Sequence, residues 1–285
     1  MGRDNMDNDT DRKVDQLRRE GWCLLERIIP KDKIDGVRAH VEAAHEMAWR
    51  DYEAMGGNIG FQTGPDGEPG TCPIAYLSEF APYLGDERLL TVVQAVFGKH
   101  IRIAQTEFKT QAPNRTDGDW RGFHSDWPHD LTDRDLAGRV AQPFPDVTMQ
   151  LSVLWMLSVF SPESGGTWVV PRSHRDPLNP RMHQTPEGLE EHIDQLKSIP
   201  GEIQVSGPAG SALVIDSRIW HSAGANPGPE PRVAVSTRYC PWWLSLEFGR
   251  RNNAIVPEAT YEALPEAVKP LFRHRAEGMD NPFRA

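Results

Sequence analysis

The chain has 285 residues, of which 38% are hydrophobic and 25% charged, and 31 basic against 41 acidic residues give it a net charge of −10. This composition supports a buried core and excludes collagen-like, coiled-coil and fully disordered chains. Because an acidic protein repels phosphate backbones and anionic lipid heads, we expect neither nucleic acid nor a membrane as a partner. A local basic pocket remains compatible with that balance.

The number and spacing of the cysteines, together with the lack of long apolar runs, indicate where in the cell the protein works. Cys23, Cys72 and Cys240 are far apart and odd in number, so they predict no disulfide framework and favour a reducing environment. No run approaches the roughly 18 apolar residues of a membrane span, and the N-terminus lacks the apolar segment of a signal peptide. We therefore expect a cytoplasmic protein, either a monomer or a homodimer.

The N-terminal part predicts a tail followed by a strand and two helices. Residues 1–13 are polar and predict a disordered tail, and residues 14–285 show no composition break, which favours a single domain. A strand is expected over 21–29. A helix follows Pro30, where apolar residues recur at helical spacing: Ile34, Val37, Val41, Ala44 and Ala48. After a Gly- and Pro-rich loop over 56–73, a second helix is expected over 86–97.

Beyond residue 100 the pattern changes to short β-branched runs separated by Pro, Gly and Asn. These runs predict strands over 101–110, 147–159, 167–170, 212–219 and 232–239. Two further helices are expected over 186–197 and 258–274. The order of elements indicates a mainly β, α+β fold, with a sandwich or jelly roll at its centre and helices at its flanks.

Three His-x-Asp patterns are candidates for a metal site: His124–Asp126, His174–Asp176 and His192–Asp194. Residues i and i+2 point to the same face of a strand, but they lie about 200° apart around a helix. The third pattern falls in an expected helix and reads as a solvated face, and the second lies in a turn that its histidine would tie down. The first lies where an extended segment ends and a loop begins, so it is the best candidate.

A third ligand should come from the end of a distant strand. His221 closes the run over 212–219 and precedes a breaker-rich stretch. Alone it could be a structural histidine, but with His124 and Asp126 it completes two imidazoles and a carboxylate, a set that suits Fe(II) with open positions.

Arg232 lies eleven residues after His221 and begins the next expected strand. Alternation can place both side chains on the inner face of a sheet. A buried guanidinium requires an anionic partner, and its planar fork fits a carboxylate. The alternative is a structural ion pair, for example with Asp216.

Taken together, these motifs resemble one known family. His124-x-Asp126, the stretch over 163–175 (ESGGTWVVPRSHR), and His221 with Arg232 are similar in order and spacing to the phytanoyl-CoA dioxygenase family, as is the opening segment over 18–26 (RREGWCLLE). The resemblance covers roughly residues 15–245. Members are non-haem Fe(II)- and 2-oxoglutarate-dependent oxygenases on a double-stranded β-helix, a cupin-like jelly roll.

The resemblance implies a role for each matched residue. His124, Asp126 and His221 would bind iron, and Arg232 would hold the distal carboxylate of 2-oxoglutarate. Gln105 and Trp155 fall near positions that line the co-substrate pocket, although ordinary core packing explains them equally well.

The sequence departs from the family pattern at two positions. Ala223 replaces a frequent Ser or Thr, so one co-substrate hydrogen bond is missing or replaced. Arg172 replaces a glycine, which suggests contact with substrate. The retained Asp126 disfavours halogenation, because related halogenases replace this carboxylate with a small residue.

The resemblance implies a dioxygenase that uses O2 and hydroxylates a C–H bond of a small molecule, with release of succinate and CO2. Four tryptophans near the predicted site suit an apolar or ring-bearing compound such as a secondary metabolite: Trp127, Trp220, Trp242 and Trp243. Arginines could instead bind an anionic substrate: Arg121, Arg172, Arg175, Arg181 and Arg238. Residues 127–145 suit either a lid or a surface loop. A cupin-like zinc or manganese isomerase or hydrolase, and a non-catalytic jelly-roll binding protein, stay open as alternatives.

Overall fold

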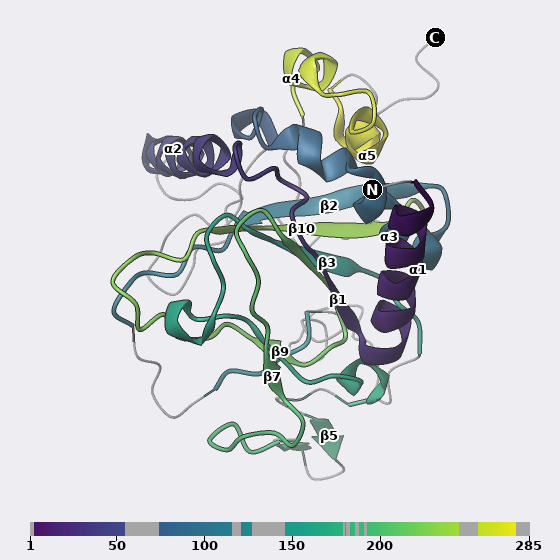
Figure 1. Ribbon diagram of the computed structural model, residues 1–285, viewed down its shortest axis with the longest axis vertical. Coiled ribbons are helices and arrows are strands. Elements are labelled where there is room, and N and C mark those ends of the chain that lie inside the picture. Colours follow the sequence, from purple (N-terminus) through teal and green to yellow (C-terminus); the bar gives the residue numbers. More distant parts are fainter. Residues whose placement is uncertain are drawn as a thin grey trace.

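A computed structural model describes most of the chain: residues 3–54, 74–115, 121–126, 146–178, 180, 183–185, 188–190, 193–244 and 256–277. Two antiparallel sheets face each other, and helices cover the outer face of the larger one (Figure 1). A further two-stranded hairpin joins β5 (His183–Thr185) to β6 (Gly188–Glu190).

The larger sheet has the strand order β1-β8-β3-β10-β2, with every neighbour antiparallel. Its strands are β1 (Trp22–Leu25), β8 (Ala212–Asp216), β3 (Leu151–Met156), β10 (Ala234–Pro241) and β2 (Ile101–Phe108). Each lies within or overlaps a predicted strand, which confirms that the β-branched runs mark the sheet. The order mixes strands from both ends of the chain, so residues far apart in sequence become neighbours.

The smaller sheet has the order β7-β4-β9 and is built from three two-residue strands: β7 (Ile203–Gln204), β4 (Trp168–Val169) and β9 (His221–Ser222). An apolar cluster joins the two sheets, with Met156 and Leu213 from the larger sheet and Val169 from the smaller. Burial of these side chains holds the sheets together at one end, because apolar area removed from water is the main favourable contribution to folding.

The main hydrophobic core lies on the other face of the larger sheet. It is covered by α1 (Arg3–Glu20), α2 (Ile34–Ala54), α3 (Glu87–Phe97) and α5 (Lys269–Phe272), with α4 (Glu258–Ala263) beside them (Figure 1). The five apolar positions predicted for the second of these helices are all buried. Asp86 caps α3 by accepting hydrogen bonds from the backbone N–H groups of Arg88 and Leu89, and Gly98 ends it with a φ of 78° that favours glycine.

Short 3-10 turns occupy several of the connections. They lie at Ile74–Tyr76, Ala81–Gly85, Pro162–Ser164, Ser173–Arg175 and Arg273–Arg275.

Three predicted elements differ from the structure. Helix α1 begins at Arg3 and buries Thr10, Val14 and Leu17, where residues 1–13 were expected to form a disordered tail. The helix expected over 258–274 is divided in two, since Pro265 favours the extended conformation that Leu264 adopts.

The helix predicted over 186–197 is wrong. Residues 188–190 form β6, and the backbone N–H of Leu196 donates to the Asp194 side chain rather than to the carbonyl of a preceding helical turn. Tertiary contacts override helix propensity in this segment.

No helix within the described parts of the chain combines the length and apolar character that crossing a membrane requires.

Candidate metal centre

Three predicted ligands meet between the two sheets. Antiparallel backbone hydrogen bonds of 3.0 and 2.9 Å pair His124 with His221, the first residue of β9. Asp126 follows two residues after His124, and its N–H donates to the carbonyl of Ser217 at 2.8 Å. The Oδ1 atom of Asp126 lies 3.8 Å from Nε2 of His124 and 3.7 Å from Nε2 of His221. In the described parts of the chain these three residues form a group whose ligand atoms all lie within 4.8 Å of one another.

The backbone fixes how both imidazoles present their nitrogens. Nδ1 of His124 lies 3.0 Å from the carbonyl oxygen of Gly122, and Nδ1 of His221 lies 3.0 Å from that of Ile219. Because a carbonyl oxygen only accepts, each Nδ1 carries the proton. Each ring therefore directs Nε2 toward Asp126, and Nε2 is the atom through which it would bind a metal ion.

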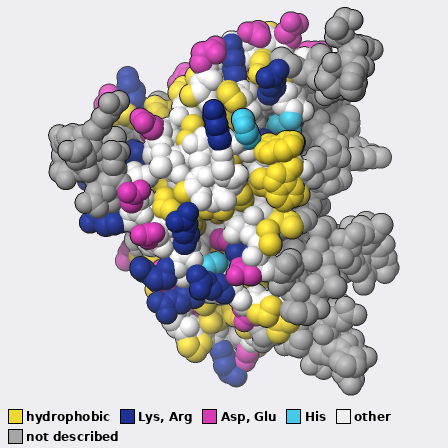
Figure 2. Space-filling view, turned by 90° about the vertical axis from the view of Figure 1, so that its right-hand side faces the viewer, with side chains coloured by type: hydrophobic (Ala, Val, Ile, Leu, Met, Phe, Trp, Pro, Cys, Tyr) yellow, Lys and Arg dark blue, Asp and Glu magenta, His cyan; other side chains and the backbone are white. Residues whose placement is uncertain are grey.

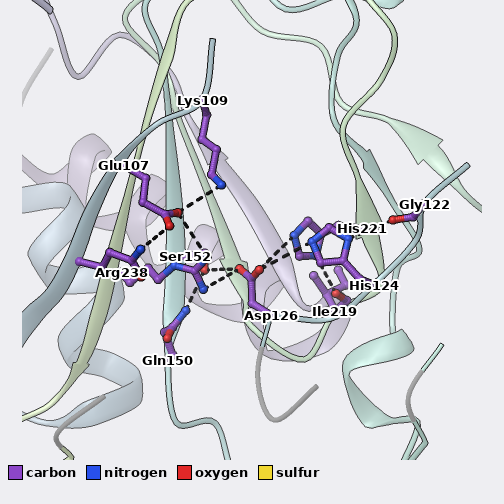
Figure 3. A network of polar contacts seen from close by, with 11 residues as sticks. Glu107, Lys109, Gly122, His124, Asp126, Gln150, Ser152, Ile219, His221 and Arg238 are labelled. Atoms are coloured by element: carbon purple, nitrogen blue, oxygen red, sulfur yellow. Dashed lines mark hydrogen bonds and ion pairs between the residues drawn. The ribbon is translucent and has the colours of Figure 1, made fainter. Parts of the chain in front are cut away.

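Asp126 is held as a carboxylate by its surroundings. Its other oxygen, Oδ2, accepts a 2.7 Å hydrogen bond from Ser152 of β3 and lies 3.4 Å from Nη1 of Arg238 of β10 (Figure 3). Burial opposes the charge, but Arg238, the two histidines and Ser152 outweigh burial and hold the pKa of Asp126 far below its usual range. A deprotonated carboxylate beside two imidazole nitrogens is a ligand set suited to a divalent ion.

A second buried carboxylate extends this network away from the ligands. Glu107 of β2 is fully buried, and its side chain lies 3.3 Å from Arg238 and 3.2 Å from Lys109, with a further hydrogen bond from Gln105 (Figure 3). Burial raises the free energy of its charged form, but Lys109 and Arg238 more than compensate and lower the pKa of Glu107. Two carboxylates thus share the Arg238 guanidinium.

Arg232 lies between the sheets, as predicted. It is 2% exposed, its Nη1 donates to the carbonyl of Gly165, and its guanidinium carbon lies 4.5 Å from the centre of the Phe160 ring. Gly165 has a φ of 79°, and a Cβ there would lie 2.3 Å from the carbonyl oxygen of Ala225, so only glycine fits this turn. The alternative of a structural Arg232–Asp216 pair is wrong, because Asp216 binds Arg218 at 2.9 Å.

The two looser co-substrate candidates lie on opposite faces of the larger sheet. Gln105 pairs with Arg238 across the strands and contacts Glu107, so it shares the face of the metal centre. Trp155 lies on the helix-covered face, where it packs edge-on against Phe80 and donates to Thr237 at 2.9 Å. For Trp155 the core-packing interpretation holds.

The remaining candidates have varied surroundings. Arg172 has an exposed side chain bound to Glu20 through two 3.1 Å hydrogen bonds, and its contact with substrate stays a prediction. His174 is buried in a turn beside Gly21. Trp242 and Trp243 are more than half exposed, and Trp220 belongs to a small apolar cluster with Phe123.

Other predicted features lie outside the described residues. These are the 127–145 loop with Trp127, together with Arg181 and His192.

Charge on the surface is uneven despite the net charge of −10. On the face shown in Figure 2, several Lys and Arg side chains gather in one group, with acidic side chains beside them and others along the upper edge. Two of the remaining candidate arginines have structural partners: Arg121 binds Glu202 at 2.6 Å, and Arg175 donates to the backbone carbonyl of Arg18.

Sequence reasoning missed several residues that build the site. Ser152 and Glu107 escaped notice, although the alternation of Gln105 and Glu107 along the strand 101–108, which places two polar side chains on one face, was a usable signal. Gln195 exchanges side-chain hydrogen bonds of 2.8 and 3.0 Å with the backbone of Phe123 and so fixes the residue before His124. No local pattern indicates this contact, because it joins positions 72 residues apart.

Two imidazoles and one carboxylate, gathered between two antiparallel sheets, form a group that could hold one metal ion in the manner of a facial triad. A family model described as "Phytanoyl-CoA dioxygenase (PhyH)" matches residues 17–234, so the chain belongs to the phytanoyl-CoA dioxygenase family. The resemblance inferred from the motifs is thereby confirmed.

Curated relatives are distant. "Dioxygenase af480" of Aspergillus fumigatus is 24% identical over 264 residues, covering 90% of this chain and 74% of that protein. "Uncharacterized protein Rv1501" of Mycobacterium tuberculosis is 27% identical over 117 residues, or 41% of this chain. The chain spans about a third (33%) of the length of that mycobacterial relative.

Solved structures share the fold. EctD from S. alaskensis with bound Fe has a TM-score of 0.57 at 20% identity, covering 81% of this chain and 76% of that one. The carbocyclase SnoK from nogalamycin biosynthesis, described as alpha ketoglutarate dependent, has a TM-score of 0.56 at 18% identity, covering 83% and 85%. The epimerase SnoN, in complex with Fe3+ and alpha ketoglutarate, has a TM-score of 0.53 at 19% identity, covering 82% and 84%.

Proposed function

We propose that the protein is an Fe(II)- and 2-oxoglutarate-dependent dioxygenase that hydroxylates a C–H bond of a small molecule, with His124, Asp126 and His221 as the iron ligands. The observation that carries the proposal is the convergence of the two histidine Nε2 atoms on one oxygen of Asp126. Membership of the phytanoyl-CoA dioxygenase family supports the same ligand set. We further propose that residues 14–285 form one domain with a jelly-roll core.

The donor set fits iron. Imidazole nitrogen and carboxylate oxygen are both ligands for Fe(II), and three protein ligands on one side leave the other positions of an octahedral ion open. When bound, iron supplies the redox chemistry by which O2, 2-oxoglutarate and the substrate C–H bond are converted to succinate, CO2 and a hydroxylated product. The protein's part is to orient the ligands, the co-substrate and the target carbon, and to exclude water.

Arg232 is the proposed partner of the distal carboxylate of 2-oxoglutarate. Its burial between the sheets and its planar donor fork suit a dianion that reaches the site from the metal side. Gln105 faces the same interior and supplies a second polar side chain near the centre. Trp155 lies on the opposite face of the sheet, so we assign it to the core.

Hydroxylation is the reaction that we propose, and the substrate stays at the level of a chemical class. The structural relatives named above are described as a carbocyclase and an epimerase as well as Fe-binding EctD, which was also solved with 5-hydroxyectoine. A shared fold therefore accommodates several outcomes of one oxidation. The exposed Trp242 and Trp243 give no support for an aromatic wall at the centre.

An anaerobic titration tests this function. Fe(II) and then 2-oxoglutarate are added to the wild-type protein and to His221→Ala, while a weak visible metal-to-ligand charge-transfer band is monitored. We expect the band in the wild type and its loss in the variant, and succinate release on admission of O2. Metal binding without the band would favour the zinc or manganese cupin alternative, and absence of both would favour a binding protein.

A further inference from the structure

The two oxygens of Asp126 face different partners. Oδ1 is directed toward the two histidine Nε2 atoms, at 3.8 and 3.7 Å. Oδ2 is directed away from them, toward the Ser152 hydroxyl at 2.7 Å and Nη1 of Arg238 at 3.4 Å (Figure 3). One carboxylate thus carries a metal-facing oxygen and an oxygen that the protein itself holds.

Neighbouring side chains fix the direction of the Ser152 hydrogen bond. The Nε2 amide of Gln150 donates to Ser152 Oγ at 3.1 Å, so that hydroxyl accepts from Gln150 and gives its own proton to Asp126. Gln150 is fully buried and Ser152 is 4% exposed. Water therefore competes little for the hydrogen bonds from Gln150 to Ser152 and from Ser152 to Asp126. Both bonds run toward Asp126, as a carboxylate acceptor requires.

Arg238 is also held in place. Its Nη2 lies 3.3 Å from Oε2 of Glu107, while its Nη1 lies at Asp126. Glu107 is anchored in turn by Lys109, at 3.2 Å, and by Gln105. A guanidinium bound at both ends has little freedom to leave Oδ2, and its charge is matched by two carboxylates.

We propose that Ser152 and Arg238 are positioning residues that hold Oδ2 of Asp126, so that the carboxylate offers the metal Oδ1 alone. This inference rests on the proposed metal site. Binding through a single oxygen keeps a coordination position open for co-substrate, and partners outside the ligand set commonly raise metal affinity by fixing ligand orientation.

Mn(II) binding measured by calorimetry, without co-substrate, tests Ser152 independently of turnover. We expect Ser152→Ala to weaken Mn(II) binding about tenfold. Ser211→Ala is the matched control, because Ser211 is a fully buried serine whose hydroxyl has no hydrogen-bond partner among the described residues. Ser152→Thr keeps the hydroxyl and should bind Mn(II) within about threefold of the wild type, as expected for retained orientation.

A charge-neutral double variant tests Arg238. Arg238→Met alone would remove one of the two cations that compensate the buried charge of Glu107 and endanger folding, so it is combined with Glu107→Gln. The two substitutions together remove one positive and one negative charge, so the net charge near the metal site is unchanged. A change in Mn(II) affinity would then report the orientation of Asp126. We expect binding about tenfold weaker than in the wild type.

The outcomes separate the two proposals. If the wild type binds Mn(II) but Ser152→Ala and the double variant bind as tightly as Ser211→Ala, the positioning role is overturned and the metal site stands. If the wild type itself does not bind, the metal site falls and the inference falls with it. Unfolding midpoints of the metal-free proteins identify a merely structural effect, which would lower stability without selectively weakening Mn(II) binding.

Discussion

The two faces of the larger sheet carry opposite chemistry on the same strands. On β3, Leu151, Val153 and Trp155 enter the core under the helices, whereas Ser152 between them binds Asp126. On β10, Tyr239 lies in that core and Arg238, its neighbour, reaches the metal centre. The helix-covered face stabilises the fold through apolar burial, and the inner face holds buried charges.

Buried charges need full compensation, because desolvation of an ion costs several kcal/mol. On the inner face this compensation is reciprocal: Arg238 balances Glu107 and Asp126, and each carboxylate has a further donor. The charged side chains of the inner face are therefore linked by hydrogen bonds and ion pairs, so that a substitution of one changes the surroundings of the others. On the helix-covered face, a substitution should act locally on packing and stability.

Replacement of Arg232 should have the largest effect. We expect Arg232→Ala to weaken 2-oxoglutarate binding about 100-fold, or about 3 kcal/mol, because the variant loses a buried bidentate partner for a carboxylate. Arg232→Lys keeps the charge without the fork and should lose about tenfold. Titration of the charge-transfer band at saturating Fe(II) measures both.

Mn(II) affinity provides the control for Arg232. The side chain of Arg232 donates to Gly165 and lies against the ring of Phe160, and we expect metal binding to stay near the wild-type value. Equal losses in metal and co-substrate affinity would show that Arg232 supports the whole inner face and does not recognise the dianion.

Trp155 tests the opposite face. We expect Trp155→Phe to lower the free energy of unfolding by about 2 kcal/mol, because it removes buried volume and leaves Thr237 without the indole donor. Metal and 2-oxoglutarate affinities should not change. Chemical denaturation measures the first quantity, and the band titration measures the second.

Thr237→Val in the same background isolates the hydrogen bond. The double variant should recover part of the lost stability. Valine removes the buried hydroxyl that Trp155→Phe leaves without its donor. A fall in 2-oxoglutarate affinity in Trp155→Phe at unchanged stability would contradict the placement of this side chain and break the division between the two faces.

Local patterns predicted most of the large sheet and all three proposed ligands. Strand runs are visible because β-branched residues lie between breakers, and His221 lies close to the end of such a run. His124 and Asp126 are instead indicated by a segment that reads as extended and is followed by a loop. The face of Trp155 was beyond such reasoning. A shift of one residue in register moves a strand side chain to the other face, and register depends on partners that are distant in sequence.

Contacts between residues that are distant in sequence account for the site residues that local patterns did not predict. Glu107 and Arg238 are 131 residues apart, and no local signal joins them. The segment after residue 186 has a helix-like composition, yet the backbone N–H of Arg121 and both backbone groups of Phe123 bind Gln195 within it. Such contacts depend on topology, which composition does not specify.

The exposed Arg172–Glu20 ion pair contrasts with the buried charges of the inner face, and its replacement should have the smallest effect. Arg172 binds Glu20 with the same two-point geometry that a buried arginine would use, but its side chain is 69% exposed. Solvent screens such a pair, so its contribution to stability is small. Arg172 also has a φ of 73°, a conformation that glycine adopts without steric cost.

Arg172→Gly should therefore leave the unfolding midpoint, Mn(II) affinity and 2-oxoglutarate affinity at their wild-type values, because relief of backbone strain offsets the lost pair. Glu20→Gln, which removes the same pair without changing the backbone at residue 172, should lower the midpoint slightly and leave both affinities unchanged. A loss of either affinity in Arg172→Gly but not in Glu20→Gln would connect this arginine to the metal centre. In that case the network of the inner face would extend through β4 to the surface, and the division between buried and exposed charge would not describe this part of the molecule.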